Sequence, residues 1–188
     1  MSLRDVVTTL AEVSTLLNVA KEVKPRPTST PDCFAARAER TAARFPYRTA
    51  VIFEGRRCTW RELNTEANRY AAALRALGLV RGDAVSVVME NRIEFLSTLI
   101  ALNKLGIIAA LINTNLTGKP LIHCMKITNS RMCIFGEERM EAIEQVRANP
   151  ELQGIERWLF VADAGREACP TWATNLGEEA ADESGANP

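Results

Sequence analysis

The sequence predicts an α/β fold, in which a mostly parallel sheet with helices on both faces is preceded by a β-hairpin. Two observations predict it. Short apolar runs alternate with amphipathic segments of helical period over residues 84–161, and two further strand-like runs flank a glycine-containing turn before them. Because strands that alternate with helices are joined by right-handed crossovers, the later runs are expected to lie parallel in one sheet.

The hairpin is predicted at residues 50–60. Residues 50–53 and 57–60 favour strands, and residues 54–56 hold the glycine turn between them. A short helix is expected just before the hairpin, at residues 31–44. Whether the hairpin joins the main sheet or stays separate from it is left open by the pattern.

The clearest helix follows the hairpin. Thr59 and Glu62 have the spacing of a capping box, in which each side chain accepts a hydrogen bond from the other residue's free backbone N–H. Apolar residues then recur every three or four positions as far as Leu77. Gly78 follows Leu77 directly, and glycine readily adopts the left-handed conformation that commonly ends a helix, so the helix is expected to end there.

The four later strand-like runs are residues 84–89, 107–112, 132–135 and 158–161. The intervening helices are expected at residues 91–106, 117–127 and 137–148. Asn91 and Thr117 are the expected N-caps of the first two. The second run is apolar throughout, which is typical of a strand buried on both faces of a parallel sheet.

Three regions are predicted along the chain: an amphipathic helix and proline-rich linker at 1–31, the α/β unit at 32–162 and an acidic tail at 163–188. We expect the helix, residues 3–20, to dock on the rest of the protein. Peripheral contact with a membrane is the alternative, although its polar face lacks the Lys and Arg that membrane-surface helices carry. The tail has six acidic residues and one arginine, so its last dozen residues are expected to be mobile.

The charge balance, the cysteine and histidine counts and the length of the apolar runs exclude several classes of function. The chain has 23 basic and 23 acidic residues, so no net charge favours binding to nucleic acid. Its five cysteines include no C-x-x-C pair and it has one histidine, so neither a zinc site nor a disulfide framework is predicted. No run reaches the roughly 18 apolar residues of a membrane span. With no secretion signal recognised, we expect a cytoplasmic protein, with membrane association left open.

Candidate site residues are few. No G-x-G-x-x-G or Walker A run occurs among the ten glycines, so no nucleotide site of the usual kind is predicted. Asn113, Thr114 and Asn115 follow a predicted strand, where open α/β sheets bind ligands, but turn formation explains them as well. We expect His123 to be a partly buried structural residue and Cys124 to be inert packing. No catalytic, cofactor-binding or metal-binding residue is assigned.

An ordered set of short segments in this sequence resembles a known enzyme family. The segments 58–64 (CTWRELN), 67–69 (ANR) and 81–83 (RGD) resemble the start of adenylate-forming enzymes, which include acyl-CoA synthetases, peptide-synthetase adenylation domains and luciferases. Residues 110–116 (ALINTNL), together with Leu121, His123 and Cys124, resemble the branch of long- and very-long-chain acyl-CoA synthetases and fatty acid transport proteins. The resemblance covers roughly residues 45–145.

The resemblance implies part of the large domain of an enzyme that uses ATP, Mg²⁺ and coenzyme A to convert a long-chain fatty acid into its thioester. It implies that the family's phosphate loop and later catalytic motifs come beyond these residues. Residues 117–120 (TGKP) share the ending of that loop but lack its preceding Ser/Thr/Gly run, so we interpret them as a helix start. The chain is therefore expected to need no cofactor and to be inactive alone.

Two alternatives remain open. The chain could be a stand-alone binding module of flavodoxin-like shape, although it lacks glycine loops. It could also be a non-catalytic scaffold that pairs with the rest of the synthetase, in which case an exposed apolar surface is expected where that partner belongs.

Overall fold

The computed structural model describes residues 12–20, 23, 32–163, 165 and 167–188, and its contacts divide the chain into two units, Met1–Asp32 and Cys33–Pro188. In the first unit a helix covers residues 12–20. The rest of the predicted helix at 3–20, and most of the linker, lie outside the described residues. The docking and membrane contact of this helix therefore stay predictions. Across the described residues no helix has the length and hydropathy that crossing a membrane requires.

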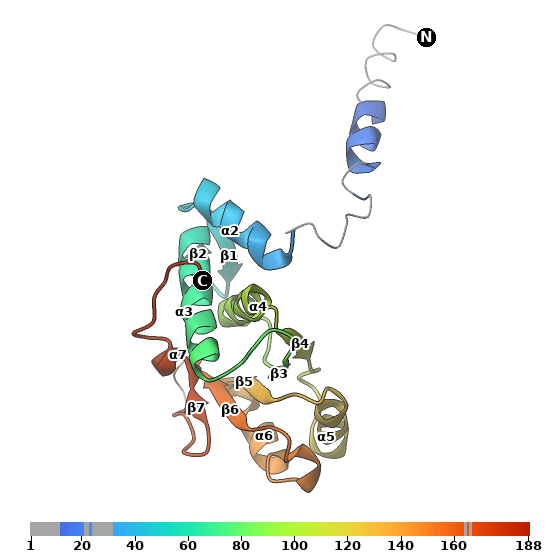
Figure 1. Ribbon diagram of the computed structural model, residues 1–188, viewed down its shortest axis with the longest axis vertical. Helices are drawn as coiled ribbons and strands as arrows, with labels where there is room; N and C mark the ends of the chain where they lie inside the picture. Colours follow the sequence, from blue (N-terminus) through green and yellow to red (C-terminus); the bar gives the residue numbers. More distant parts are fainter. Residues whose placement is uncertain (1–11, 21–22, 24–31, 164, 166) are drawn as a thin grey trace, which may run out of the picture. The chain divides into compact units, whose positions relative to one another are not determined.

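The second unit begins with a helix and a hairpin, and then alternates strands with helices (Figure 1). Its first elements are α2 (Phe34–Arg44), β1 (Thr49–Phe53), β2 (Arg56–Thr59), α3 (Trp60–Ala76), β3 (Ala84–Val88), α4 (Ile93–Leu105) and β4 (Ile108–Leu111). Its later elements are α5 (Gly118–Ile127), β5 (Met132–Gly136), η1 (Glu137–Arg139), α6 (Met140–Val146), η2 (Pro150–Leu152), β6 (Arg157–Val161), β7 (Thr174–Asn175) and α7 (Leu176–Glu179).

The capping box of α3 is confirmed. Thr59 Oγ1 accepts a hydrogen bond from the backbone N–H of Glu62 at 3.3 Å, and the Glu62 carboxylate accepts one from the Thr59 N–H at 2.8 Å. Gly78 follows the helix with φ +94°, a left-handed conformation that glycine adopts without steric cost. The start and the end of this helix are thus both fixed by local sequence.

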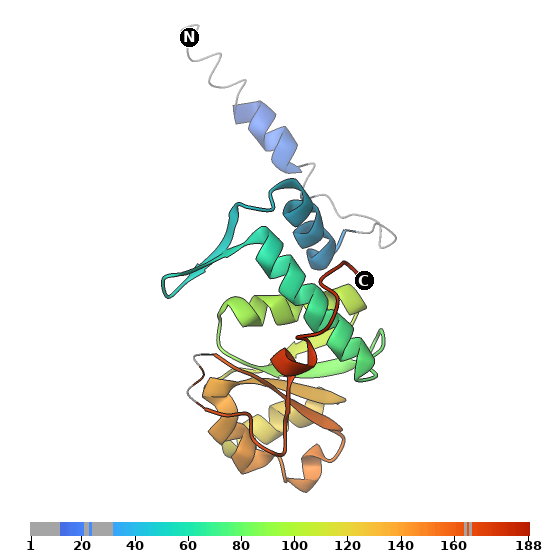
Figure 2. The ribbon, with the colours of Figure 1, turned by 90° about the vertical axis from the view of Figure 1, so that its left-hand side faces the viewer.

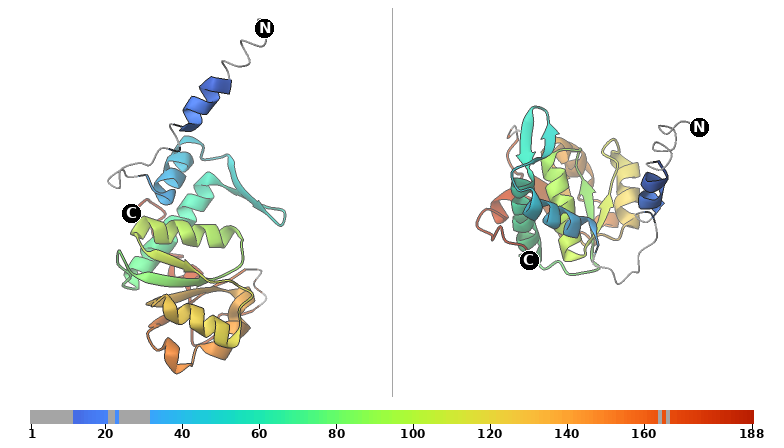
Figure 3. Two further views of the ribbon diagram at one scale, coloured as in Figure 1. Left: turned by 90° about the vertical axis from the view of Figure 1, so that its right-hand side faces the viewer. Right: turned by 90° about the horizontal axis from the view of Figure 1, so that it is seen from above.

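The strands form two separate sheets. β1 and β2 pair as an antiparallel hairpin outside the main sheet; its strands pack against α3 and α4, and its turn projects from the unit (Figure 3). The main sheet has the order β4-β3-β5-β6-β7, and each neighbouring pair is parallel. The predicted α/β class, with a parallel sheet preceded by a hairpin, is confirmed.

Each face of the main sheet is covered by its own helices (Figure 2). Met132 and Ile134 of β5 pack with buried residues of α3, α4 and α7. Cys133 and Phe135 of the same strand pack with α5 and α6. This alternation follows from the two-residue period of a strand and explains why β5 is apolar throughout.

The sequence prediction for β4 is wrong in one respect. The strand was expected to be buried on both faces, yet Ile108 is 59% exposed and Leu111 is 57% exposed. The reason is its position, because β4 forms one edge of the described sheet and has a neighbour on one side only. Apolar composition predicts a strand but does not reveal how many neighbours the strand has.

The helix N-caps also differ from expectation. Arg92, and not Asn91, occupies the N-cap of α4, without a side-chain cap hydrogen bond. Thr117 is at the N-cap of α5 as predicted, but its hydroxyl makes no cap hydrogen bond. Residues 117–120 nevertheless begin a helix, as their sequence indicated.

The acidic tail folds back onto the unit. Leu176 is fully buried and Ala180 is 3% exposed against the α3–α4 face of the sheet. Asn68 Nδ2 donates to the carbonyl of Gly185 at 2.7 Å, and Asn64 Nδ2 donates to Asn187 Oδ1 at 2.9 Å. The tail therefore packs against the unit, and the mobility of its last dozen residues stays a prediction. The acidic composition of the tail gave no indication that Leu176 and Ala180 are buried.

Replacing Leu176 with alanine should lower the free energy of unfolding by about 2–5 kcal/mol, because the change leaves a cavity in the core beneath α7. Urea denaturation of the full chain measures this. Val80→Ala is the matched control, since Val80 is 60% exposed and should change stability by no more than about 0.5 kcal/mol. Equal stability of the two variants would show that the tail does not pack as described.

Candidate functional site

The order of the strands indicates where a ligand site belongs. From β3 the chain passes to β4 on one side and then to β5 on the other, which is the order of flavodoxin-like sheets. Such sheets bind ligands at the carboxyl ends of the two strands where the direction of winding changes. The loops that follow β3 and β5 are therefore the first place to look.

The side chain of Arg92 fills this place. Its guanidinium donates to two backbone carbonyls at the end of β6, from Nη2 to Val161 at 2.9 Å and from Nη1 to Ala162 at 2.7 Å. Only 2% of the side chain is exposed. Arg92 therefore joins the loop after β3 to the end of β6 across the carboxyl edge of the sheet.

Three carboxylates surround this guanidinium. Glu94 lies 3.2 Å from it, and Glu138 and Asp163 each lie 3.5 Å from it. Glu94 also pairs with Arg56 of the hairpin at 2.7 Å. A buried arginine needs this kind of pairing, because taking its charge out of water without a partner is costly. We call these five residues the Arg92 cluster.

Glu138 is held in the cluster by the backbone around it. Its Oε1 accepts a hydrogen bond from the N–H of Glu90 at 2.7 Å. A side chain at Gly136 would collide with the Glu138 carboxylate, so that position has room for glycine alone in this arrangement. The ends of β3 and β5 are thereby tied together.

The neighbouring carboxylate of Glu137 anchors the loop after β6. It accepts hydrogen bonds from three backbone N–H groups, those of Asp163 at 2.7 Å, Gly165 at 3.2 Å and Glu167 at 2.8 Å. Glu137 is 6% exposed. Side chains of the chain itself thus occupy the place where a flavodoxin-like sheet would bind a phosphate, and three carboxylates against one buried arginine disfavour an anion there.

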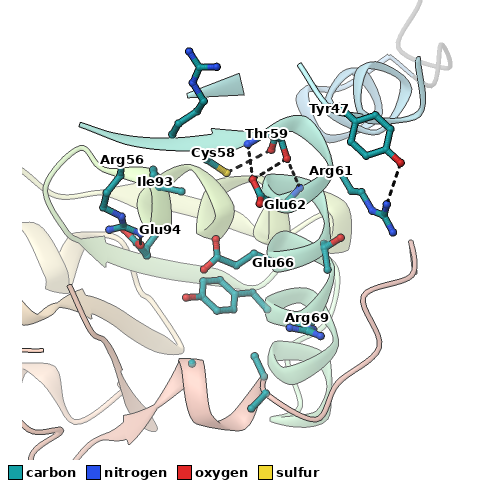
Figure 4. A pocket seen from close by; sticks show the side chains of 16 residues that line it. Tyr47, Arg56, Cys58, Thr59, Arg61, Glu62, Glu66, Arg69, Ile93 and Glu94 are labelled. Carbon is teal, nitrogen blue, oxygen red and sulfur yellow. Dashed lines mark hydrogen bonds and ion pairs between the residues drawn. The ribbon is translucent and has the colours of Figure 1, made fainter. Parts of the chain in front are cut away.

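A hollow of about 830 Å³ opens beside the hairpin (Figure 4). Its walls come from β2, α3, the start of α4 and α7. The lining residues are Tyr47, Arg56, Arg57, Cys58, Thr59, Arg61, Glu62, Thr65, Glu66, Arg69, Tyr70, Ile93, Glu94, Gly177, Ala180 and Ala181. Arg56 and Glu94 belong both to this hollow and to the Arg92 cluster.

Glu66 is an acid of the hollow with a perturbed pKa. Burial raises the pKa of its carboxyl, opposed in part by a hydrogen bond from Ser97 Oγ at 2.6 Å, and the nearby charge of Glu94 raises it further. Burial and the neighbouring Glu66 also raise the pKa of Tyr70. Burial, with the charge of Glu62, raises the pKa of Cys58 to about 11. The Cys58 thiol is therefore protonated at neutral pH and is a poor nucleophile.

A groove lies at the carboxyl ends of β3 and β4. It encloses about 730 Å³ and is lined by Phe53, Glu54, Val87, Met89, Glu90, Asn91, Phe95, Leu111, Ile112, Asn113 and Thr114. Asn113 Oδ1 accepts a hydrogen bond from the N–H of Asn115 at 2.9 Å, so this segment forms a turn. Asn113 and Thr114 thus both form the turn and line the groove; a role in ligand binding stays a hypothesis.

The remaining candidates lie apart from these features. His123 is exposed, so the prediction of a partly buried histidine is wrong; it faces outward from α5 while Leu121 and Met125 face the core. Cys124 is partly buried against the core between α5 and the sheet. Within the described part of the chain no three acidic, histidine or cysteine side chains are grouped to hold a metal.

Sequence reasoning missed Arg92, Glu94 and Glu66. The signal for Arg92 was present, because charged residues stand directly between a buried strand and an apolar helix at residues 90–94. Their partners lie far along the chain, however, and no local pattern indicates them. Glu66 lies on the predicted helix beside the apolar stripe, where it resembled an ordinary surface residue.

Replacing Arg92 with alanine should lower the free energy of unfolding by about 3–5 kcal/mol, because Glu94 and the two neighbouring carboxylates would lose a buried counter-charge. Urea denaturation of the full chain at neutral pH measures the loss. Arg57→Ala is the control, since Arg57 is exposed. A loss for Arg92→Ala no larger than for Arg57→Ala would contradict the structural role of the cluster.

The raised pKa of Glu66 predicts a pH dependence. The folded state holds this proton to higher pH than the unfolded state, whose glutamate titrates near 4.5. The stability contribution of Glu66 is therefore complete below 4.5 and is lost as pH rises through the raised folded pKa. Glu66→Gln should gain stability relative to the parent chain over that interval and then stay level to about pH 8. A difference in unfolding free energy that is flat across this range would contradict it.

Comparison with known proteins adds the family. The family model of AMP-binding enzymes matches residues 38–185, which is nearly all of the second unit. The N-terminal domain of FACL13 from Mycobacterium tuberculosis has the same fold, with a TM-score of 0.70 at 25% identity over 82% of this chain and 36% of that one. The anthranilate CoA ligase AuaEII gives a TM-score of 0.73 at 23% identity, covering 81% of this chain and 28% of that one.

Relatives in sequence agree with this result. Long-chain fatty acid transport protein 1 of Mus musculus is 36% identical over 107 residues, which are 56% of this chain and 17% of the relative. The long-chain-fatty-acid–CoA ligase FadD13 of Mycobacterium tuberculosis is 33% identical over 104 residues, 55% of this chain and 21% of that protein. The matched part of this chain thus spans about a fifth of the length of these relatives. The chain belongs to the family of AMP-binding enzymes and corresponds to the N-terminal part of an acyl-CoA synthetase.

Proposed function

We propose that this chain forms the N-terminal scaffold of an ATP-dependent fatty acyl-CoA synthetase, which converts a fatty acid, ATP and coenzyme A into acyl-CoA, AMP and pyrophosphate. The observation that carries the proposal is the family match over residues 38–185, the same residues that build the sheet and its helices. The names of the mouse and mycobacterial relatives support a long-chain fatty acid as substrate.

The chemistry requires a site for the phosphates of ATP, and the described residues do not form one at the place where the strand order predicts it. In such a reaction the fatty acid carboxylate attacks the α-phosphate of ATP, and coenzyme A then displaces AMP, so phosphate charge must be neutralised. Among the described residues the expected place for a phosphate holds Arg92 with the carboxylates of Glu94, Glu138 and Asp163. The residues present therefore do not fit ATP with Mg²⁺, and we propose that this chain alone is inactive.

Its role would then be structural. The Arg92 cluster fixes the hairpin, the ends of the strands and the loop after β6 relative to one another, which gives later parts of a synthetase a rigid surface. A cytoplasmic location, membrane contact through residues 3–20 and association with the remaining part of the synthetase complete the proposal.

The purified chain, given ATP, Mg²⁺ and a long-chain fatty acid, should show no exchange of pyrophosphate into ATP above a blank without protein, because carboxylates surround the buried arginine at the place where the strand order predicts a phosphate site. A radiolabelled exchange assay measures this. Full-length FadD13 of Mycobacterium tuberculosis serves as the positive control. Exchange clearly above the blank would refute the scaffold role.

A second candidate is a stand-alone binding module, which the flavodoxin-like strand order favours. The Arg92 cluster counts against it, because this cluster fills the place where such a module would bind its ligand. Calorimetric titration with ATP and AMP separates the two functions. Affinity in the micromolar range would favour the module, whereas the absence of binding heat is expected from the scaffold.

A further inference from the structure

The edge strand β4 presents unused backbone groups. The N–H of Ile108 donates to the carbonyl of Asp83 at 2.8 Å, and that of Ile112 donates to the carbonyl of Val87 at 3.0 Å. In a parallel pair, alternate residues point their N–H and C=O groups to opposite sides. Ala109 and Leu111 therefore direct these groups away from β3, where the described strands place no neighbour.

This edge has few of the usual protections against pairing. Natural edge strands are shielded by charged residues, proline or bulges. Residues 108–111 are Ile-Ala-Ala-Leu, without a charge or a proline, and their pairing with β3 has no bulge. The opposite edge, β7, has two polar residues only, Thr174 and Asn175. The two edges of the sheet thus differ in chemistry, and β4 is the one suited to pairing.

The apolar surface continues beyond the strand. Leu111 also lines the groove at the carboxyl ends of β3 and β4, together with Phe53, Met89 and Phe95. Ile108 and Leu111 are more than half exposed. We call the free edge of β4 and this groove the β4 surface, because they share Leu111.

We propose that the β4 surface binds an extended apolar segment from the remaining part of an acyl-CoA synthetase, which continues the sheet as a further strand. A peptide backbone is the only common partner with alternating N–H and C=O groups that match those of Ala109 and Leu111. A fatty acid would contact the apolar side chains of the groove but would leave these backbone groups without partners. The inference rests on the proposed function, since the remaining part of a synthetase is its source.

The relatives favour this occupant over a second copy of the chain. In the solved N-terminal domain of FACL13 the shared fold is 36% of the chain, and in AuaEII it is 28%. Most of each relative thus consists of further residues in the same polypeptide, which are available to lie against this fold. A second copy is the competing occupant.

Hydrogen exchange tests the contact directly. The full chain is mixed with the part of Mycobacterium tuberculosis FadD13 that lies beyond the matched segment. Exchange of the Ala109 and Leu111 amides should slow about tenfold or more in the complex, because both become hydrogen-bonded. Exposed amides of the opposite edge, such as that of Thr171, should be unchanged.

A matched pair of variants makes the test specific. Leu111→Lys places a charge on the β4 surface, and Thr171→Lys places the same charge at an exposed position beside β7. Both should keep the thermal midpoint of the isolated chain within about 2 °C. Leu111→Lys should weaken the complex about tenfold or more, whereas Thr171→Lys should not. A single-chain fusion of the two pieces gives a second measurement, in which Leu111→Lys should lower the thermal midpoint more than Thr171→Lys.

The outcomes separate this contact from the proposed function. Failure of the pieces to associate, with equal behaviour of the two variants in the fusion, would overturn the contact. Unprotected amides at Ala109 and Leu111 in a complex would overturn it too. So would self-association of the isolated chain that Leu111→Lys abolishes, because it would assign the edge to a second copy. Acyl-CoA formation by a complex with unprotected amides would leave the proposed function standing without the contact. Protected amides in a complex that makes no acyl-CoA would leave the contact standing without the function.

Discussion

The arrangement of the second unit depends on the hydrogen bonds and ion pairs of the buried Arg92 guanidinium. The guanidinium donates hydrogen bonds to two backbone carbonyls at the carboxyl end of β6. It also pairs with Glu94, which in turn pairs with Arg56 of the hairpin. Three segments that are distant in sequence are thereby held at one edge of the sheet. Desolvating this charge is costly, so the cluster is stable only while all of its partners stay in place. The cluster fixes the relative positions of these segments more than it adds to the free energy of unfolding.

The same cluster explains why a fold suited to ligand binding holds no obvious ligand site in its described part. The strand order places a crevice between β3 and β5. Charged side chains and anchored backbone fill this crevice, with Glu137 holding the loop after β6 through three N–H groups. The hollow beside the hairpin and the groove at β4 remain open in the described part of the chain. The scaffold role that we propose rests on where these charges lie.

Local features of the fold could be predicted from the sequence, whereas its long-range features could not. The capping box of Thr59 and Glu62 and the glycine turn of the hairpin are local, and both are confirmed. The exposure of β4 and the burial of Leu176 depend on neighbours far along the chain; the first was misjudged and the second was not predicted. The Arg92 cluster was missed for the same reason. Residues 110–116 helped to identify the family because an ordered set of residues, unlike periodicity, records ancestry.

We propose that these residues build a scaffold and do not bind ATP. Nuclear magnetic resonance of the labelled full chain tests it most directly, by following the amides of Gly136, Asp163 and Glu167 and the Arg92 side chain while ATP and Mg²⁺ are added. The account predicts that these signals stay unchanged at millimolar nucleotide. Saturable shifts centred on the loops after β3, β5 and β6 would contradict it.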